Sequence, residues 1–173
     1  IKNWLRSGGN IIALKDANKW LKRNDVMNLE WVEDNGTNEE DPSYEELGRY
    51  RGAQVTGGVI CQSKLDITHP LGYGYHSGEL PVFVNTNNYF RMPENIYASP
   101  LVFSENPQIS GYISEENLDR IGSSAGIIIS KYGEGRIISF SFNPNFRAFW
   151  YGTNKLFLNA VFFGSLIDTR STN

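Results

Sequence analysis

The sequence predicts an α/β domain in which helices pack against a sheet, and three observations support this prediction. A helical stretch ending at a glycine pair leads into the short apolar strand 10–14, and a second helix follows at once. Two β-branched apolar runs flank residues 132–135, which predicts a hairpin. An aromatic helix closes the chain. This alternation of helices and strands is typical of layered α/β folds.

Residues 1–121 supply most of the expected strands. After the helix over residues 1–7 and the strand "NIIAL", Asp16 is expected to cap a helix with Trp20 and Leu21 on one face. The segments "AQVTGGVICQ", "ELPVFVN" and "NIYASPLVF" have the apolar, β-branched character of strands. A serine-capped helix, "SEENLDRI", follows them, with acidic residues in its first turn where the helix dipole favours them.

The second half predicts a hairpin, "AGIIISKYGEGRIISFSF", and then a helix from about Asn154 to Phe163. Thr153 is the expected cap of this helix and Gly164 its stop. Its apolar residues cover too much of the circumference for an exposed face: Leu156, Phe157, Ala160, Val161 and Phe163. We therefore expect this helix to be packed between the sheet and other elements.

Composition indicates a single folded domain over residues 1–173. The hydrophobic content of 40%, with 10 Phe, 9 Tyr and 4 Trp, argues against disorder. No apolar run approaches the roughly 20 residues of a membrane helix. The net charge is −3 and the basic residues are scattered along the sequence, which is not the pattern of a nucleic-acid-binding protein.

Two segments of the sequence indicate how the chain is organised: an acidic loop and the opening helix. Residues from about 28 to 48 concentrate acidic side chains beside Gly36 and Pro42, which predicts a solvated loop, since the ligand spacing of a calcium loop is absent. The opening "IKNWLRSGGNIIAL" has the pattern of the second half of a helix running into a strand. We therefore expect the chain to be a fragment of a longer protein.

Two candidate nucleophiles lie in sequence contexts that do not suit catalysis. Ser124 lies in "GSSAG", but a nucleophile elbow needs a strand before the serine and a helix after it, and here a helix precedes and a strand follows. Cys61 ends an apolar strand, where a buried cysteine behaves as a small inert hydrophobic residue. We predict no catalytic residues in this segment.

A possible zinc pair is equally weak. "HSGE" places His76 three residues before Glu79, but a catalytic zinc needs three protein ligands and no histidine follows Glu79. His69 lies upstream on a stretch with no rigid frame. We expect no metal and no cofactor in this segment.

The remaining candidates are contact residues. The loop "LDITHPLGYGYHSGELPVF" gathers five of them, and a sixth precedes the last helix: Asp66, His69, Tyr73, Tyr75, His76 and Arg147. Loops at strand ends are where α/β folds bind ligands, but the same side chains could simply fix the loop's shape. Arg147 could bind a carboxylate or pair with an internal acid such as Asp66. The sequence leaves both interpretations open.

Several segments together resemble one family. They are "SGGNIIAL", "ANKWL", "LDITHPLGYGY", "LPVF", "ISGYIS" and "GEGRIISFSFNPNFRAFWYGTNKLFLNAVFFG", and the sharpest are "THPLGYGY" and "NPNFRAFWYGTNKLFLNA". Across nearly its whole length the chain looks like the C-terminal type 1 glutamine amidotransferase-like domain of bacterial zinc carboxypeptidase-like proteins.

The resemblance implies a flavodoxin-like three-layer α/β sandwich of the class I glutamine amidotransferase type, without the catalytic triad. The family's first strand is expected to be missing here, and the C-terminal hairpin and closing helix to be present. The resemblance also implies an exported, secreted or periplasmic parent protein. Zinc would be held only by the parent's upstream peptidase domain, which would be this segment's partner.

Three functions follow as hypotheses. The first is a non-catalytic accessory domain of a secreted zinc metallocarboxypeptidase-like protein, serving inter-domain packing or ligand contact. The second is a binding module for a small ligand such as a sugar or peptide. The third is a hydrolase or amidotransferase using Cys61 or Ser124, which requires a nucleophile close to a histidine.

Overall fold

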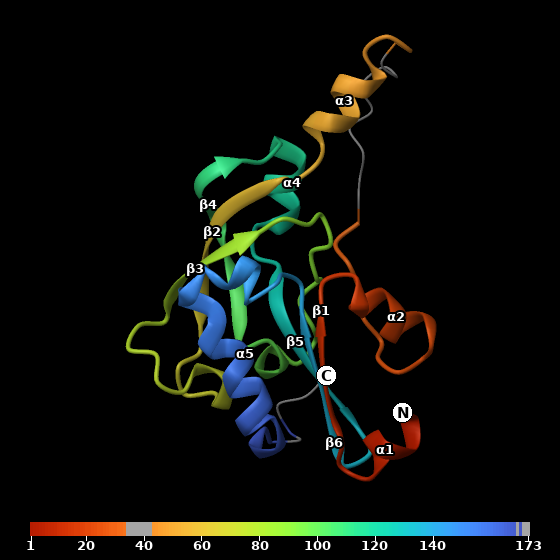
Figure 1. Cartoon of the computed structure of the whole chain (residues 1–173), viewed down its shortest axis with the longest axis vertical. Helices are drawn as coiled ribbons and strands as arrows, with labels where there is room; N and C mark the ends of the chain where they lie inside the picture. The colour runs from red at the N-terminus through yellow and green to blue at the C-terminus, as the bar shows by residue number, and fades with distance from the viewer. Residues whose placement is uncertain (34–42, 169, 171–173) are drawn as a thin grey trace.

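The computed structural model describes residues 1–33, 43–168 and 170, and within them the chain is a mixed α/β domain around one curled six-stranded sheet (Figure 1). The α/β class predicted from the sequence is confirmed. The strands are β1 (Asn10–Leu14), β2 (Gly58–Leu65), β3 (Glu79–Val84), β4 (Leu101–Tyr112), β5 (Ala125–Tyr132) and β6 (Gly135–Phe140).

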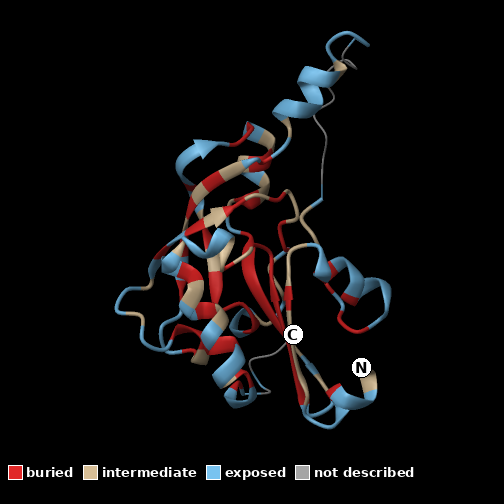
Figure 2. Ribbon diagram, in the orientation of Figure 1, coloured by how far each residue is buried: buried red, intermediate tan, exposed pale blue. Residues whose placement is uncertain are grey.

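The strands lie in the order β1-β6-β5-β4-β2-β3. β1 and β6 are parallel, and the other four neighbouring pairs are antiparallel. β1 and β3 are therefore the two edges of the sheet. Strand β6 is buried along its whole length, and β5 is buried except at its last three residues (Figure 2).

Helices cover both faces of the sheet. The helices are α1 (Lys2–Arg6), α2 (Ala17–Arg23), α3 (Leu47–Ala53), α4 (Glu115–Ile121) and α5 (Tyr151–Phe163), with 3-10 turns η1 (Pro70–Gly72), η2 (Ile96–Ala98), η3 (Phe146–Ala148) and η4 (Gly164–Leu166). Of these helices, α3 has no buried residue and projects away from the sheet (Figure 1). Leu156 and Ala160 of α5 join the larger hydrophobic cluster, with Ile138 and Phe140. Leu5 of α1 and Leu21 of α2 join the second cluster on the opposite face. Among the described helices, none is long and apolar enough to cross a membrane.

The predicted hairpin is confirmed as β5 and β6, which pair from Ile127 opposite Phe140 to Tyr132 opposite Gly135. Gly133 in its turn has a φ of +64°, and a Cβ there would lie 2.6 Å from the Cα of Arg6. Only glycine fits this turn without displacing α1. The predicted α1, β1, α2 and α4 are also present, and Ser114 caps α4 by accepting the N–H of Asn117 at 3.3 Å.

The closing helix differs from its prediction in two ways. It begins at Tyr151, and Thr153 lies inside it, where the buried hydroxyl donates to the carbonyl oxygen of Pro144 at 2.6 Å instead of capping the helix. It is also not enclosed on all sides. One face, which we call the outer face of α5, exposes four apolar side chains: Tyr151, Leu158, Val161 and Phe162.

Two strand predictions were wrong at their starts. β2 begins at Gly58 because residues 53–57 complete α3 and a turn, and Val55 is exposed. The prediction from Asn95 onward contains η2 instead, whose first turn is capped by the Asn95 side chain. β4 begins only after Pro100, which has no N–H for the sheet, and it extends to Tyr112.

The predicted acidic loop corresponds to three different parts. Residues 34–42 lie outside the described residues. Residues 28–33 pack against the domain, since Leu29 is buried and Trp31 forms an isolated β-bridge with Phe90. The end of the segment enters α3, which the sequence did not predict.

Candidate functional site

A hollow of about 570 Å³ opens beside the loop that joins β2 to β3, and we call it the loop hollow. Three of its lining residues, Asp66, His69 and Tyr73, were predicted as contact residues. The full lining is Asp66, Thr68, His69, Pro70, Tyr73, Tyr97, Leu166, Asp168 and Arg170. The site thus combines the loop with residues from η2 and the chain's C-terminal segment.

Local hydrogen bonds give the loop its shape. Asp66 Oδ1 accepts from the N–H of Thr68 at 2.9 Å and from its hydroxyl at 2.6 Å. The His69 ring then caps η1, because Nδ1 accepts the N–H of Leu71 at 3.1 Å. A Cβ at Gly72 would collide with the carbonyl oxygen of Asp66, so the turn closes only with glycine. The sequence "DITHPLG" is therefore a tightly folded unit.

His69 is the least satisfied polar group of the site. Only 8% of the residue is exposed, and burial lowers its pKa to about 4 although the negative charge of Asp66 opposes the shift. The ring is therefore neutral at pH 7. Because Nδ1 accepts a hydrogen bond, the proton lies on Nε2, and Nε2 has no hydrogen-bond partner among the described residues. An unpaired buried donor is costly, at about 1–3 kcal/mol.

The charged groups of the hollow are two carboxylates and one guanidinium. Burial would raise the pKa of Asp66, but the hydrogen bonds from Thr68 outweigh it and the pKa lies below its ordinary value. Hydrogen bonds from Arg170 lower the pKa of Asp168 to about 2, and the shortest contact of this pair is 2.6 Å. Both carboxylates are therefore ionised at neutral pH, and Arg170 is already bound to one of them.

Helix α5 holds the loop in place. The buried amide of Asn159 donates to the carbonyl oxygens of Leu71 at 2.8 Å and Tyr73 at 2.9 Å. Lys155 Nζ donates to the carbonyl of Gly74 at 2.7 Å, and the Tyr75 hydroxyl donates to the carbonyl of Gly152 at 2.8 Å. The loop and the helix thus form one unit behind the hollow.

Three of the predicted contact residues do not line the hollow. Tyr75 faces α5 and serves the anchoring just described. His76 is exposed farther along the loop. Arg147 is exposed at η3, with its guanidinium 5.3 Å from the centre of the Phe146 ring, and no ion pair to it occurs within the described chain. Arg147 and Asp66 therefore do not pair with each other.

The two nucleophile candidates lie in settings unsuited to catalysis. Cys61 is fully buried in β2, and burial raises the pKa of its thiol to about 12. The buried hydroxyl of Ser124 donates to the carbonyl oxygen of Ile121 at 2.7 Å. A nucleophile must be deprotonated or hydrogen-bonded to a base, and neither residue meets this requirement.

The described residues contain no group of three or more His, Cys, Asp and Glu side chains arranged to hold a metal ion. His76 and Glu79, the possible zinc pair, are both exposed.

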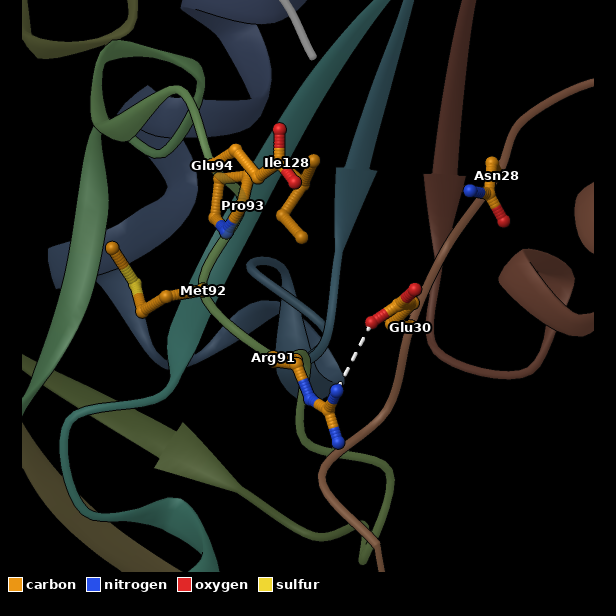
Figure 3. Close-up of a pocket in the computed structure, with 7 residues that line it drawn as sticks. All are labelled: Asn28, Glu30, Arg91, Met92, Pro93, Glu94 and Ile128. Atoms are coloured by element: carbon orange, nitrogen blue, oxygen red, sulfur yellow. Dashed lines mark hydrogen bonds and ion pairs between the residues drawn. The ribbon is translucent and has the colours of Figure 1, made fainter.

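A second hollow, of about 450 Å³, lies between residues 28–30 and 91–94 on the other face of the sheet (Figure 3). Arg91 reaches across it to Glu30, with Nη1 and Oε2 3.3 Å apart, and also lies 3.8 Å from Glu33. Ile128 of β5 also lines this hollow. These ion pairs link the two walls of the hollow and already engage Arg91 and Glu30. This hollow is therefore a poorer candidate for a ligand site than the loop hollow.

Sequence reasoning missed six residues that line the hollow, and also Asn159, which anchors the loop: Thr68, Pro70, Tyr97, Leu166, Asp168 and Arg170. Tyr97, Leu166, Asp168 and Arg170 come from segments that carry no recognisable motif. Asn159 did leave a signal, because it is a polar residue on the same helical face as Leu156, Ala160 and Phe163. A buried amide in an apolar stripe indicates a backbone partner elsewhere in the fold.

No protein-family model matches the chain, and no curated protein or solved structure matches it significantly.

Proposed function

We propose that this chain is a non-catalytic ligand-contact domain, and that the loop hollow binds a small, neutral, hydroxyl-rich molecule such as a sugar. The observation that carries the proposal is the buried, unpartnered Nε2–H of His69 beside the hollow. Nε2 is buried in the structure, so we propose that a small shift of the ring brings its proton to a ligand oxygen, which gives the unpaired donor a partner on binding.

The rest of the hollow favours a sugar over a peptide. The carboxylates of Asp66 and Asp168 can accept hydroxyl protons, and Tyr73 and Tyr97 offer aromatic surface. A peptide carboxylate would have to compete with Asp168 for Arg170 and would lie near two like charges. Buried Cys61 and Ser124 support a role in binding instead of hydrolysis or amide transfer.

The test is a binding titration monitored by NMR. The probes are glucose, galactose, N-acetylglucosamine, maltose and chitobiose, with the dipeptide Ala-Ala as the carboxylate arm. We expect at least one saccharide to shift signals of Tyr73 and Tyr97, and His69→Asn to weaken its binding at least tenfold. The same substitution at exposed His76, His76→Asn, is the matched control and leaves binding unchanged. Binding of Ala-Ala alone, or of no probe, would contradict the proposal.

The second candidate is a role as an accessory domain of an exported zinc carboxypeptidase-like protein, docked on the upstream peptidase domain. The outer face of α5 favours it, because 77% of Tyr151 and 70% of Phe162 are exposed next to Leu158 and Val161. Contiguous apolar surface of this kind marks protein interaction sites. In this proposal the zinc belongs to the peptidase domain.

Two measurements test the docking. The coding sequence that precedes Ile1 should encode a peptidase domain with its own zinc ligands. That domain, produced separately, should bind this chain, and Leu158→Glu/Phe162→Glu should weaken the binding more than tenfold. A matched control, Ile109→Glu/Tyr112→Glu, changes two exposed apolar residues on β4 instead. Equal effects of the two double variants, or a different upstream domain, would refute the docking.

We also propose that the fold is a flavodoxin-like sandwich of the class I glutamine amidotransferase type. The parallel pairing of β1 with β6 and the helices on both faces support this. The four antiparallel pairs depart from an all-parallel sheet. An experimental structure that superimposed better on antiparallel α+β folds than on this family would exclude it.

A further inference from the structure

Strand β1 has an open hydrogen-bonding edge. The carbonyl of Gly9 accepts from Arg136 at 3.3 Å, and the N–H of Lys15 donates to Phe140 at 3.0 Å, so the odd-numbered residues face β6. The main-chain groups of Asn10, Ile12 and Leu14 therefore point away from the sheet. Within the described chain these groups have no hydrogen-bond partner.

The opposite edge of the same sheet is closed to further pairing. β3 contains Pro81 and an exposed Glu79, and the indole of Trp150 donates to the carbonyl of Pro81 at 3.3 Å. Phe146 stacks on Phe83 of β3 with ring centres 4.1 Å apart. Prolines, charges and covering loops are the usual protection of edge strands. β1, "NIIAL", has no proline and no charge, and its register with β6 is regular.

Positive charge flanks the open edge. Residues 1–23 carry six basic side chains and one acidic one, a net charge of +5, whereas the other 150 residues carry ten basic and eighteen acidic side chains. The only acid, Asp16, is paired with Lys19 at 3.0 Å. Helices α1 and α2 pack on the same face of the sheet, beside β1 (Figure 1). Their side chains Trp4 and Trp20 are exposed. Six of the 16 basic residues thus lie in the first 23 positions, so the description of the basic residues as scattered does not hold at this end of the sequence.

We propose that β1 accepts an acidic, extended segment of a partner protein as a seventh strand. The unpaired main-chain groups of Asn10, Ile12 and Leu14 supply the hydrogen bonds, and α1 and α2 supply the charge complementarity. Successive side chains of the added strand point to opposite faces. Its acidic residues would face the basic helices, and its apolar residues would cover half-buried Ile12 and Leu14 on the other face.

The test uses a capped nine-residue peptide of alternating Glu and Val, with a control peptide in which Lys replaces Glu. We expect only the acidic peptide to bind, and Lys19→Glu/Arg23→Glu to weaken it about tenfold. The matched control is Arg51→Glu/Lys64→Glu, which makes the same charge change at exposed positions away from β1 and leaves binding unchanged. Bound peptide should slow amide hydrogen exchange at Ile12 and Leu14, which the α1 and α2 charges alone would not do.

Each alternative occupant gives a different result. Equal binding of the two peptides, or binding without slower exchange at Ile12 and Leu14, would overturn strand addition. So would amides of Ile12 and Leu14 that are already protected in the free protein, because the edge would then be occupied by a second copy or another segment. Binding of duplex RNA or DNA in preference to the peptide would assign the basic surface to another partner.

Discussion

At the scale of single residues, His69 links the shape of the loop to its chemistry. Its Nδ1 is used to cap η1, which fixes the proton on Nε2, and burial keeps the ring neutral. The same residue therefore stabilises the turn and lines the loop hollow, while its Nε2 donor is buried and has no partner among the described residues. A lysine or arginine in this place would bring a charge into a buried setting, whereas neutral imidazole brings only one directed proton.

The depressed pKa of His69 predicts a dependence of stability on pH. Unfolded His69 binds a proton near pH 6.5 and the folded residue only near pH 4, so the unfolded state takes up more protons between these values. This contribution is fully present above pH 6.5 and is lost as the pH falls towards 4. It amounts to at most about 3 kcal/mol in the free energy of unfolding.

Urea unfolding at pH 7.5 and pH 4.5 measures this effect. His69→Asn keeps an acceptor for the N–H of Leu71 but cannot titrate, so it should lose less stability between the two pH values than the wild type does. His76→Asn should behave as the wild type. An equal loss in wild type and His69→Asn would show that His69 is not the titrating group.

The residues of the site could be predicted where they lie close together along the sequence. Asp66, His69 and Tyr73 were predicted as contacts because they share one glycine- and proline-rich loop. The same hollow is also lined by residues that lie 24 or more positions after Tyr73 in the sequence, namely Tyr97, Asp168 and Arg170. No local sequence pattern indicates that they come close to the loop. Arg147 was a plausible candidate that the fold places on η3, outside the hollow.

At the scale of elements, the loop that carries the site depends on α5. Asn159 satisfies two carbonyl oxygens of the loop, which would otherwise be left without partners against the helix. This explains a polar residue on the inner face of an aromatic helix. The same arrangement couples the position of η1 to that of α5.

We predict that Asn159→Ala lowers the free energy of unfolding by about 2 kcal/mol, because two buried carbonyl groups lose their donors. Hydrogen exchange should also become faster in residues 69–75. The matched control is Asn154→Ala, five positions earlier on the same helix, where the buried Oδ1 has no partner among the described residues. If the two variants were equally stable, the amide of Asn159 would not anchor the loop.

Helices and strands could be predicted where one sequence pattern dominates the segment. The hairpin of β5 and β6 is read from β-branched runs around a glycine turn, and the structure confirms it. Prediction was wrong where a short apolar segment suits more than one structure, as at residues 53–57, where Ala53 and Val55 imitate a strand but belong to α3 and a turn. The packing of α5 could not be predicted, because the apolar residues of a helix can face either the core or a binding partner and the sequence does not distinguish the two.

At the scale of the whole molecule, one curled sheet separates two regions with different properties. The α5 face carries the loop hollow and an exposed apolar surface, and the face of α1 and α2 carries the positive charge. The proposed contacts therefore lie on different parts of the domain and can be tested independently. Loss of sugar binding in His69→Asn would leave binding at β1 intact, and charge reversal on α2 would leave the hollow intact.

The most direct test of the ligand-contact proposal is the ¹⁵N-detected imidazole spectrum of His69 at pH 7, with and without the saccharides. We predict a neutral ring with its proton on Nε2, and a downfield shift of that proton when a sugar oxygen accepts it. A ring protonated on Nδ1, or saccharide binding that leaves the Nε2 proton unmoved, would contradict the account.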